Sequence, residues 1–285
     1  MTQFPELAWL VRKVLSAWSR PEVWGSVALL LGLVALTPRL KGTGSLAEAV
    51  KTRGFRTDAL YVLFYMGGFY SFLVSAPLQR ALSAMVTQRV PFLRADLLAG
   101  LHPAAQFAAL FVAMDLLSYV AHRLSHRVWF LWLLHSIHHS QPALTAFTNF
   151  RFHLGDVLFR TLVQFPFFVL LGSPTLAGLP LPWLAVWASV LLEGLAHCDL
   201  PWRFGALGGL LVSPAFHRIH HSVEARHHDR NFGIAFSVWD RLFGTAADDR
   251  ERPTAYGLAA PRVPESFLGQ LAFPVVEAAR GRPRP

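Results

Sequence analysis

The chain has 285 residues, of which 53% are hydrophobic and 15% are charged, and its mean hydropathy is +0.38. Soluble domains carry about 25% charged residues, so this composition excludes a typical soluble domain and indicates a membrane protein. The net charge of +9 is spread over loops without a nucleic-acid-binding motif. We therefore interpret it as membrane topology and affinity for anionic headgroups, and we expect no nucleic-acid partner. The single cysteine, Cys198, excludes an intrachain disulfide and a thiolate metal cage.

Residues 1–95 are predicted to be an N-terminal membrane anchor region. Its first 22 residues could form an interfacial helix. The uncharged segment 23–37 is short for a membrane span, which needs about 20 residues, and we interpret it as an uncleaved anchor. A basic linker at 38–57 precedes a predicted span at 59–79, and a basic loop at 80–95 follows it.

Residues 96–250 are predicted to be the catalytic domain. A third span is expected at about 97–121, and two further apolar segments occupy 157–172 and 181–196. The uncharged turn 173–180 joins these two segments.

The expected fold is therefore all-α, a polytopic membrane bundle of four to five membrane-embedded helices. Residues 122–153 and 198–250 would form a helical cap on it. Residues 251–285 are expected to be a C-terminal tail that is partly disordered.

The distribution of Arg predicts the orientation of the bundle. The turn 173–180 has no Lys or Arg, whereas the His-bearing segments and the C-terminal region hold more than half of all Arg. Arg-rich segments face the cytoplasm. The active site is therefore expected on the cytoplasmic side of a multi-pass protein, in a bacterial inner membrane or its equivalent.

Eight of the thirteen histidines fall into three clusters with helical spacing. Positions i, i+3 and i+4 share one helix face, so each cluster should point its imidazoles into one small volume. Imidazole is the commonest nitrogen ligand for Zn, Cu, Fe and Ni. Eight imidazoles are too many for one ion and suit two. The clusters are His122 and His126, then His135, His138 and His139, and finally His217, His220 and His221.

Two polar residues precede the first cluster on the same helical stripe. Asp115 and Tyr119 lie seven and three residues before His122. A carboxylate in an apolar span usually has a partner, and metal-bound His commonly donates its second N–H to a carboxylate. Asp115 and Tyr119 are therefore predicted to support a ligating imidazole, with local capping or a pair to Arg123 as the alternative for Asp115.

The motifs HRLSH, HSIHH and HRIHH resemble the three histidine boxes of the fatty acid hydroxylase/sterol desaturase superfamily. The stretch Thr145 to His153 and the run from His217 to Thr245 are also similar to segments of that family. The resemblance covers roughly residues 110–245. It implies an integral membrane enzyme that uses a histidine-bound dinuclear iron centre and O2 to hydroxylate or desaturate an unactivated C–H bond of a lipid.

The resemblance also implies site residues. All eight clustered histidines would be metal ligands, and His197 and His153 match further family positions. Glu193 could ligate iron, orient His197 or be a simple helix-end residue. Asp229 and Asn231 match the family's Asp-x-Asn pattern and are expected to cap the backbone or bond to ligands.

Several properties stay open at this stage. No haem-binding or flavin-binding extension is present, so electrons would come from a separate ferredoxin, or from a cytochrome with its reductase. Spacing does not distinguish iron from zinc. The alternative is a non-redox membrane metalloprotein, either a dizinc hydrolase with Glu193 as its base or a metal transporter. The RFH segment at residues 151–153 favours hydroxylation, and the substrate lipid is not defined.

Overall fold

The computed structural model describes residues 21–41, 50–93, 96–171, 175–176, 179–258 and 262–281. The expectations for residues 1–20 and for the last four residues lie outside this part of the chain. The helices and turns in chain order are α2 (Pro21–Lys41), α4 (Arg53–Met66), η1 (Ser71–Ser75), α5 (Ala76–Arg89), η2 (Pro91–Leu93), α6 (Pro103–Arg127), α7 (Trp129–His139), η3 (Ala146–Phe150), α8 (Leu154–Leu171), α9 (Leu181–His197), η4 (Gly205–Gly209), α10 (Pro214–His220), η5 (Ala225–His227), α11 (Val238–Leu242) and α12 (Phe267–Ala279).

The prediction of an all-α fold is confirmed for the described residues. Their only strands are β1 (Thr175–Leu176) and β2 (Leu179–Pro180), which pair antiparallel as a short hairpin. This hairpin occupies the predicted uncharged turn between α8 and α9.

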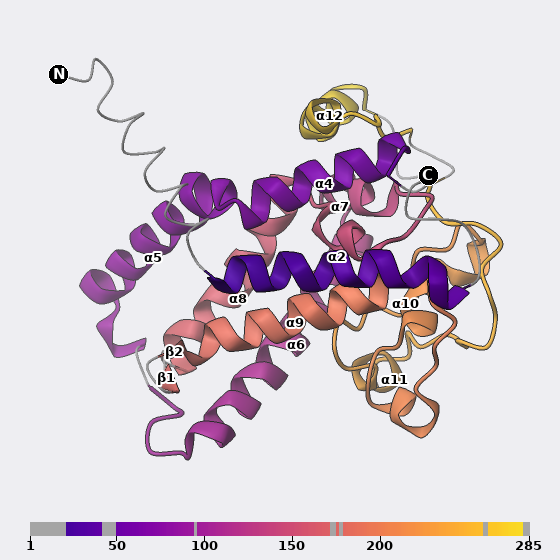
Figure 1. The fold of residues 1–285 in the computed structure, drawn as a ribbon. Helices are drawn as coiled ribbons and strands as arrows, with labels where there is room; N and C mark the ends of the chain where they lie inside the picture. The colour runs from indigo at the N-terminus through magenta and orange to yellow at the C-terminus, as the bar shows by residue number, and fades with distance from the viewer. Residues whose placement is uncertain are drawn as a thin grey trace.

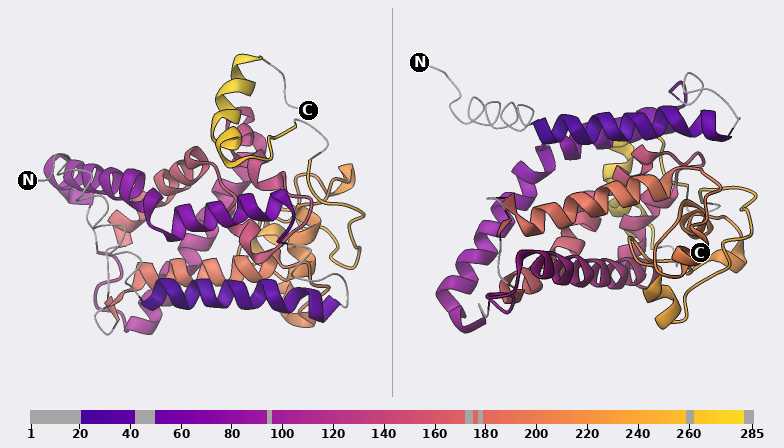
Figure 2. Two further views of the ribbon diagram at one scale, coloured as in Figure 1. Left: turned by 45° about the horizontal axis from the view of Figure 1, so that its top comes forward. Right: turned by 60° about the horizontal axis from the view of Figure 1, so that its bottom comes forward.

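The long helices lie alongside one another, and the short helices gather at one end. Helix α9 packs against both α2 and α6, and α8 packs against α6. Figures 1 and 2 show α9 between α2 and α6, with α7, α10 and α11 at the end away from the β1–β2 hairpin. The histidine clusters therefore come together where the long helices meet the short ones.

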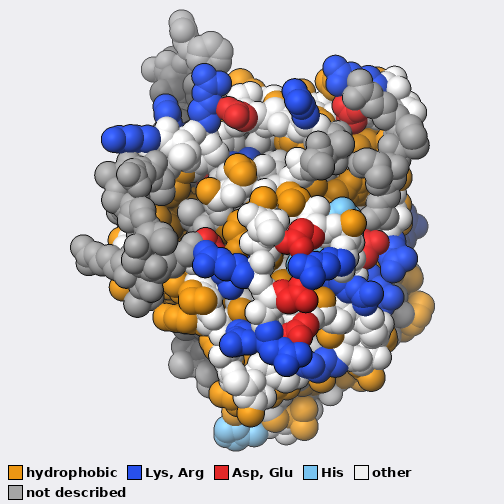
Figure 3. All heavy atoms as spheres, turned by 90° about the vertical axis from the view of Figure 1, so that its right-hand side faces the viewer, with side chains coloured by type: hydrophobic (Ala, Val, Ile, Leu, Met, Phe, Trp, Pro, Cys, Tyr) orange, Lys and Arg blue, Asp and Glu red, His pale blue; other side chains and the backbone are white. Residues whose placement is uncertain are grey.

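That end of the molecule also carries a charged surface. Figure 3 shows Lys, Arg, Asp and Glu side chains gathered on this face. Its ion pairs include Arg226 with Glu224 and Glu251, and Arg250 with Asp248. Exposed pairs of this kind contribute little stability. They do identify a face that suits water better than lipid.

Helix α6 is delimited by local sequence signals. The His102 ring accepts a hydrogen bond from the Ala104 N–H, and Pro103 occupies the first helical position, where no N–H is needed. The helix ends at Val128, whose extended backbone allows α7 to begin at Trp129. This tight corner brings the first and second histidine clusters together.

Within the part of the chain that the structure describes, two helices are long and apolar enough to cross a membrane, Pro103–Arg127 and Leu154–Leu171. The predicted span at 59–79 is not one continuous helix. Helix α4 ends at Met66, Gly68 has a positive φ of 81°, and a π-helical turn leads into α5. A positive φ favours glycine and interrupts a helix. The change of direction between α4 and α5 is visible in Figure 1.

The segment 251–285 contains a packed helix that the sequence did not predict. Helix α12 starts at the cap Ser266, and it buries Gln270, Phe273 and Glu277 against α4 and α7. A hydrogen bond from Thr57 to the Glu265 carbonyl (2.6 Å) also ties it to α4. Most of the expected tail is therefore part of the folded unit.

A buried carboxylate joins α4 to the segment that follows α7. Asp58 is completely buried and accepts hydrogen bonds from Arg151, Gln141 (2.6 Å) and Thr148 (3.1 Å). Arg151 also donates to the Gly54 carbonyl at 2.8 Å. Because each partner is satisfied, this ion pair fixes the chain between the second histidine cluster and α8.

Candidate metal centre

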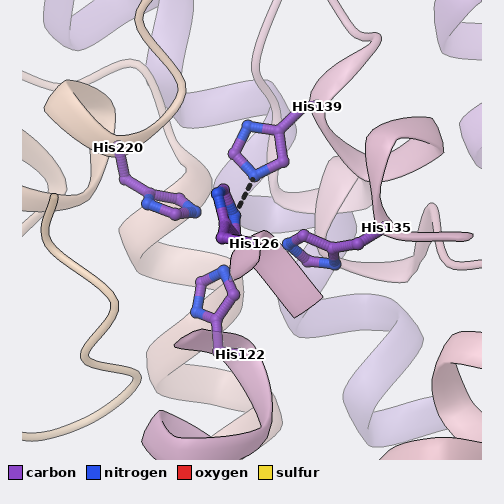
Figure 4. A group of neighbouring side chains, drawn as sticks. All are labelled: His122, His126, His135, His139 and His220. Carbon is purple, nitrogen blue, oxygen red and sulfur yellow. Dashed lines mark hydrogen bonds between the residues drawn. The ribbon is translucent and has the colours of Figure 1, made fainter. Parts of the chain in front are cut away.

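Nine buried histidines form two groups, and within each group the ring nitrogens lie close enough together to bind one metal ion. Within each group, one ligand atom per residue lies within 4.8 Å of every other. The first histidine group is His122, His126, His135, His139 and His220, and the second histidine group is His138, His197, His217 and His221. Figure 4 shows the five rings of the first group converging from α6, α7 and α10.

The spacing of the Nε2 atoms fits metal coordination. In the first histidine group, His126 Nε2 lies 3.1 Å from His139 Nε2. In the second, His197 Nε2 lies 3.1 Å from His138 Nε2 and 3.0 Å from His217 Nε2. Nitrogens that bind one ion at about 2.1 Å, at right angles to each other, are separated by about 3 Å.

Other ring nitrogens support the same interpretation. The Nε2 atoms of His122, His135 and His220 are buried and have no hydrogen-bond partner among the described residues. Buried polar atoms without a partner are rare and call for an explanation. Bound metal would supply the missing partner, so the residues present fit two ions.

Each H-x-x-H-H motif is divided between the two groups. His135 and His139 belong to the first group, whereas His138 belongs to the second. In the third cluster the first and last histidines, His217 and His221, belong to the second group. On a helix, i+3 and i+4 lie on opposite sides of i and about 100° apart. Neighbouring histidines can therefore serve two different ions.

Backbone carbonyls fix the ring orientation of three histidines. Nδ1 of His122 bonds to the Phe232 carbonyl at 2.9 Å, and Nδ1 of His220 bonds to the Arg230 carbonyl at 2.7 Å. Nδ1 of His197 bonds to the carbonyl of Glu193 at 2.7 Å. A carbonyl oxygen only accepts, so each Nδ1 carries the proton and leaves the Nε2 lone pair free for a metal.

One carboxylate, Asp156, contacts a ring of the first histidine group directly. Its Oδ2 accepts from His135 Nδ1 at 2.9 Å, and its Oδ1 accepts from the Ser125 hydroxyl at 3.4 Å. Asp156 lies in the first turn of α8 and is almost completely buried. Asp156 fixes the orientation of the His135 ring, as the backbone carbonyls do for His122, His197 and His220. Its negative charge would also offset the charge of a bound dication.

Burial keeps the imidazoles of the cap neutral. It lowers the pKa of His138 and His139 in α7, of His217 and His220 in α10 and of His221 directly after α10, because the charged form loses its hydration. Neighbouring histidines lower these pKa values further. Neutral imidazole is the form that binds metals.

Aromatic rings surround the two groups. Phe152 stacks on His138, with ring centroids 4.3 Å apart. Trp132 and Phe232 lie against His126 with centroids 4.9 and 5.0 Å away. These rings limit access of water and restrict rotation of the imidazoles.

The structure gives Asp115 partners other than the two that were expected. Its carboxylate accepts from the Ala235 N–H (2.8 Å), the Phe236 N–H (3.1 Å) and the Trp239 indole N–H (2.8 Å). It therefore contacts neither an imidazole nor Arg123 through these bonds. Asp115 instead holds the loop whose Phe232 carbonyl orients His122.

Tyr119 lies next to that loop without contacting an imidazole by hydrogen bond. Its hydroxyl is 2.8 Å from the Thr245 hydroxyl, which donates to Asp240 at 2.6 Å. Asp240 accepts from the Phe232 and Gly233 N–H groups as well. Tyr119 thus belongs to the support of the loop.

The remaining expected site residues occupy different positions. Asp229 Oδ1 lies 3.6 Å from His126 Nδ1. Asn231 donates to the Phe216 carbonyl and accepts from the Ala247 N–H. Glu193 contacts the site through its backbone carbonyl. Both Asp229 and Asn231 have a φ of 57°, a conformation in which Asp and Asn are enriched.

His153 is not brought into either histidine group, contrary to the expectation that it ligates metal. Its Nε2 bonds to the Leu271 carbonyl at 3.1 Å, and its Nδ1 accepts from the Gly155 N–H at 3.0 Å. Both ring nitrogens are therefore occupied. Its partner Leu271 lies in α12, the helix that the sequence did not predict.

Two carboxylates of the site were missed in the sequence. The first is Asp156, which stands four residues before Arg160 at the start of an otherwise apolar segment. This charged pair was the available signal. Asp240 lies within the C-terminal motif but carried no spacing signal of its own. The carbonyl acceptors are independent of side-chain identity and leave no trace in the sequence.

Residues 107–245 match the sequence model of the family described as fatty acid hydroxylase. These residues belong to the fatty acid hydroxylase family. The match confirms the resemblance and coincides closely with the range of 110–245 on which it was recognised. All nine histidines of the two groups lie within this fatty acid hydroxylase domain.

Curated relatives share about half of the chain. Ornithine lipid hydroxylase OlsE of Rhizobium tropici is 37% identical over 167 residues, which are 57% of this chain and 48% of that protein. Human alkylglycerol monooxygenase is 28% identical over 53% of this chain and 32% of its own length. Methylsterol monooxygenase 2-2 of Arabidopsis thaliana is 29% identical, with coverage of 50% and 52% respectively.

The matched part of the chain thus spans from about a third to about half of the length of these relatives. No solved structure matches the chain.

Proposed function

We propose that this chain is a membrane-bound, O2-dependent oxygenase that hydroxylates, or desaturates, an unactivated C–H bond of a lipid. The observation that carries the proposal is the convergence of nine buried imidazoles into two adjacent groups inside a fatty acid hydroxylase domain. The similar proteins support it, because those described above are named hydroxylases or monooxygenases.

We propose iron as the metal, with one ion in each histidine group, and zinc as a possible substitute. Bound iron would supply the electrons that reduce O2 to a species able to take hydrogen from a C–H bond. In hydroxylation one oxygen atom enters that bond and the other leaves as water, so each turnover consumes two electrons and two protons. A separate ferredoxin, or a cytochrome with its reductase, would deliver the electrons.

The protein's own residues hold this centre in place. Asp156 and the backbone carbonyls set the tautomers of the ligating rings. Asp229 Oδ1 lies 3.6 Å from His126 Nδ1, so its negative charge would offset part of the charge of a bound cation. Asp115 and Asn231 act one step further away, by fixing the loop that provides the carbonyl for His122.

The placement in the membrane is also proposed. Four to five membrane-embedded helices would place the apolar surfaces of α6 and α8 in lipid, and the cap of α7, α10 and α11 at the cytoplasmic face. The charged surface in Figure 3 supports a cap in water. The two candidate spans and the uncharged hairpin at the opposite end support the rest. A reporter fused to the C-terminus tests the orientation.

Metal analysis of anaerobically purified protein tests the proposed chemistry. We expect two iron ions per chain, a spectral change on addition of O2, and O2-dependent formation of a hydroxylated lipid when reductant is supplied. Protein that binds zinc alone and consumes no O2 after reconstitution with iron would contradict an oxygenase and favour a hydrolase.

A further inference from the structure

Helix α8 carries a single polar stripe in an otherwise apolar candidate span. Asp156, Arg160 and Gln164 follow one another at intervals of four residues, so they lie on one face. The helix packs against α6, and hydroxyls of α6 satisfy both ends of the stripe. Ser125 donates to Asp156 at 3.4 Å, and Gln164 donates to Ser118 at 3.0 Å.

Arg160, the middle member of the stripe, is not satisfied. Its Nε and Nη2 atoms are buried and have no hydrogen-bond partner among the described residues. The Asp156 carboxylate is 3.6 Å from Nε, too far for a hydrogen bond. Between the two serines α6 offers Ala121, which has no polar side chain, and His122, whose Nδ1 already bonds to a carbonyl.

The unsatisfied guanidinium lies beside the metal centre. Arg160 stands over the Phe152 ring at 4.8 Å, and the same ring stacks on His138 of the second histidine group at 4.3 Å. Asp156, the ion-pair partner of Arg160, bonds to His135 of the first group. One side chain therefore separates Arg160 from each group. An ionisable residue inside a membrane span is a site of function by default.

The charges around Arg160 select a neutral partner. Asp156 already balances the guanidinium from 3.6 Å. A free anion would meet the Asp156 carboxylate, whereas an uncharged oxygen would not. The two N–H groups still require an acceptor, because a buried donor left without one is costly.

We propose that Arg160 donates hydrogen bonds to a carbonyl oxygen of the lipid substrate, an ester or an amide. The carbon that is oxidised then lies within a few bonds of that carbonyl. The position of oxidation rests on the proposed function. The binding of the carbonyl does not, and it can be tested without turnover.

The test compares two probes that differ only in the carbonyl. A long-chain fatty acid methyl ester and the alkyl methyl ether of equal chain length are titrated into the purified protein in detergent micelles, and tryptophan fluorescence reports binding. Loss of a hydrogen bond to a charged donor corresponds to about a 10- to 100-fold change in affinity. We expect the ester to bind more tightly than the ether by such a factor, and Arg160→Met to abolish the difference.

A matched control uses the next residue of the stripe. Gln164→Leu removes a polar group whose partner is inside the protein, so the preference for the ester should persist. Equal binding of ester and ether to the wild-type protein would overturn the proposal, and would leave a trapped water as the partner of Arg160. Tightest binding by the free fatty acid would overturn the choice of a neutral acceptor.

The same comparison separates the two proposals. A protein that discriminates ester from ether but never consumes O2 would retain the Arg160 subsite and contradict the oxygenase. Equal turnover of the ether and the ester would support the oxygenase and contradict the Arg160 subsite.

Discussion

Asp156→Asn should weaken metal binding in the first histidine group and leave the second group intact. The substitution keeps the shape of the side chain and removes its charge. Asp156 Oδ2 lies 2.9 Å from His135 Nδ1 and accepts a hydrogen bond from it. The second group is reached from α7, α9 and α10, and none of its four rings contacts Asp156.

The expected magnitude follows from the bonds that change. Removal of a carboxylate that orients a ligating imidazole costs about 10- to 100-fold in metal affinity or activity. The asparagine can still accept from His135 through its amide oxygen, but its NH2 group can also face the ring and reverse the tautomer. The other contact, from Ser125 at 3.4 Å, is long and weak. We therefore expect a loss of affinity nearer the upper figure for one ion.

Iron per folded chain and its affinity are measured by titration of the metal-free protein with Fe(II), with circular dichroism as the check on folding. Two binding steps are expected in the wild-type protein, and only the step of the first group should move in Asp156→Asn. Ser125→Ala is the matched control, since it removes the weaker contact to the same carboxylate and should shift this step by less than about threefold. An unchanged titration, or equal weakening of both steps, would refute the reasoning.

The remaining predictions use other parts of the centre. His139→Ala should weaken the metal of the first group, whereas His138→Ala, one residue away, should weaken that of the second, and the spectrum of each half-loaded protein should differ. Asp58→Asn should lower the free energy of unfolding by about 3–5 kcal/mol, because it leaves the buried Arg151 guanidinium without its charged partner. Loss of the exposed Arg53–Glu265 pair is the control and should change the free energy of unfolding by less than about 1 kcal/mol. Equal thermal midpoints of these two variants in detergent would contradict this prediction. The metal-free protein should lose stability as the pH falls below about 6.5, because the buried histidines of the cap have lowered pKa values and stay neutral while the unfolded chain takes up protons. A thermal midpoint that is flat from pH 7.5 to pH 5 in chelator would rule out that linkage.

The sequence predicted well which clustered histidines come together, because helical spacing is a local property. His122, His126 and the two H-x-x-H-H motifs are placed by positions within one or two turns, and a periodicity argument captures such positions. The interleaving of two sites also follows from that spacing once both motifs are helical. His197 required the family resemblance, since it stands alone at the end of α9.

The sequence could not identify the partners of the ligands. Asp115 shares a helical stripe with His122, and this suggested a bond between the two. Its carboxylate actually meets backbone N–H groups more than 100 residues further along the chain, at Ala235 and Phe236. Spacing fixes which face a side chain occupies, whereas the segment packed against that face depends on the tertiary fold.

The break in the predicted span at 59–79 has a similar origin. The segment is uncharged and mostly apolar, so composition alone indicates one continuous helix. Gly67 and Gly68 are adjacent, and only Gly68 takes a positive φ. Isolated glycines are tolerated in apolar helices, and the bend is decided by the packing of α4 and α5 against different neighbours.

The metal centre depends on elements outside the fatty acid hydroxylase domain, and the N-terminal region is therefore more than an anchor. Tyr65 of α4 donates to the Phe152 carbonyl at 2.8 Å, and Phe152 stacks on His138. Asp58 of the same helix holds Arg151, and α12 holds His153 through a carbonyl. Three consecutive residues between the second histidine cluster and α8 thus take their positions from helices that carry no family motif. Because an imidazole must be placed within a fraction of an ångström to serve a metal, we infer that α4 and α12 are structural parts of the catalytic unit. Residues 107–245 expressed alone would keep every histidine of both groups and lose the contacts that align them.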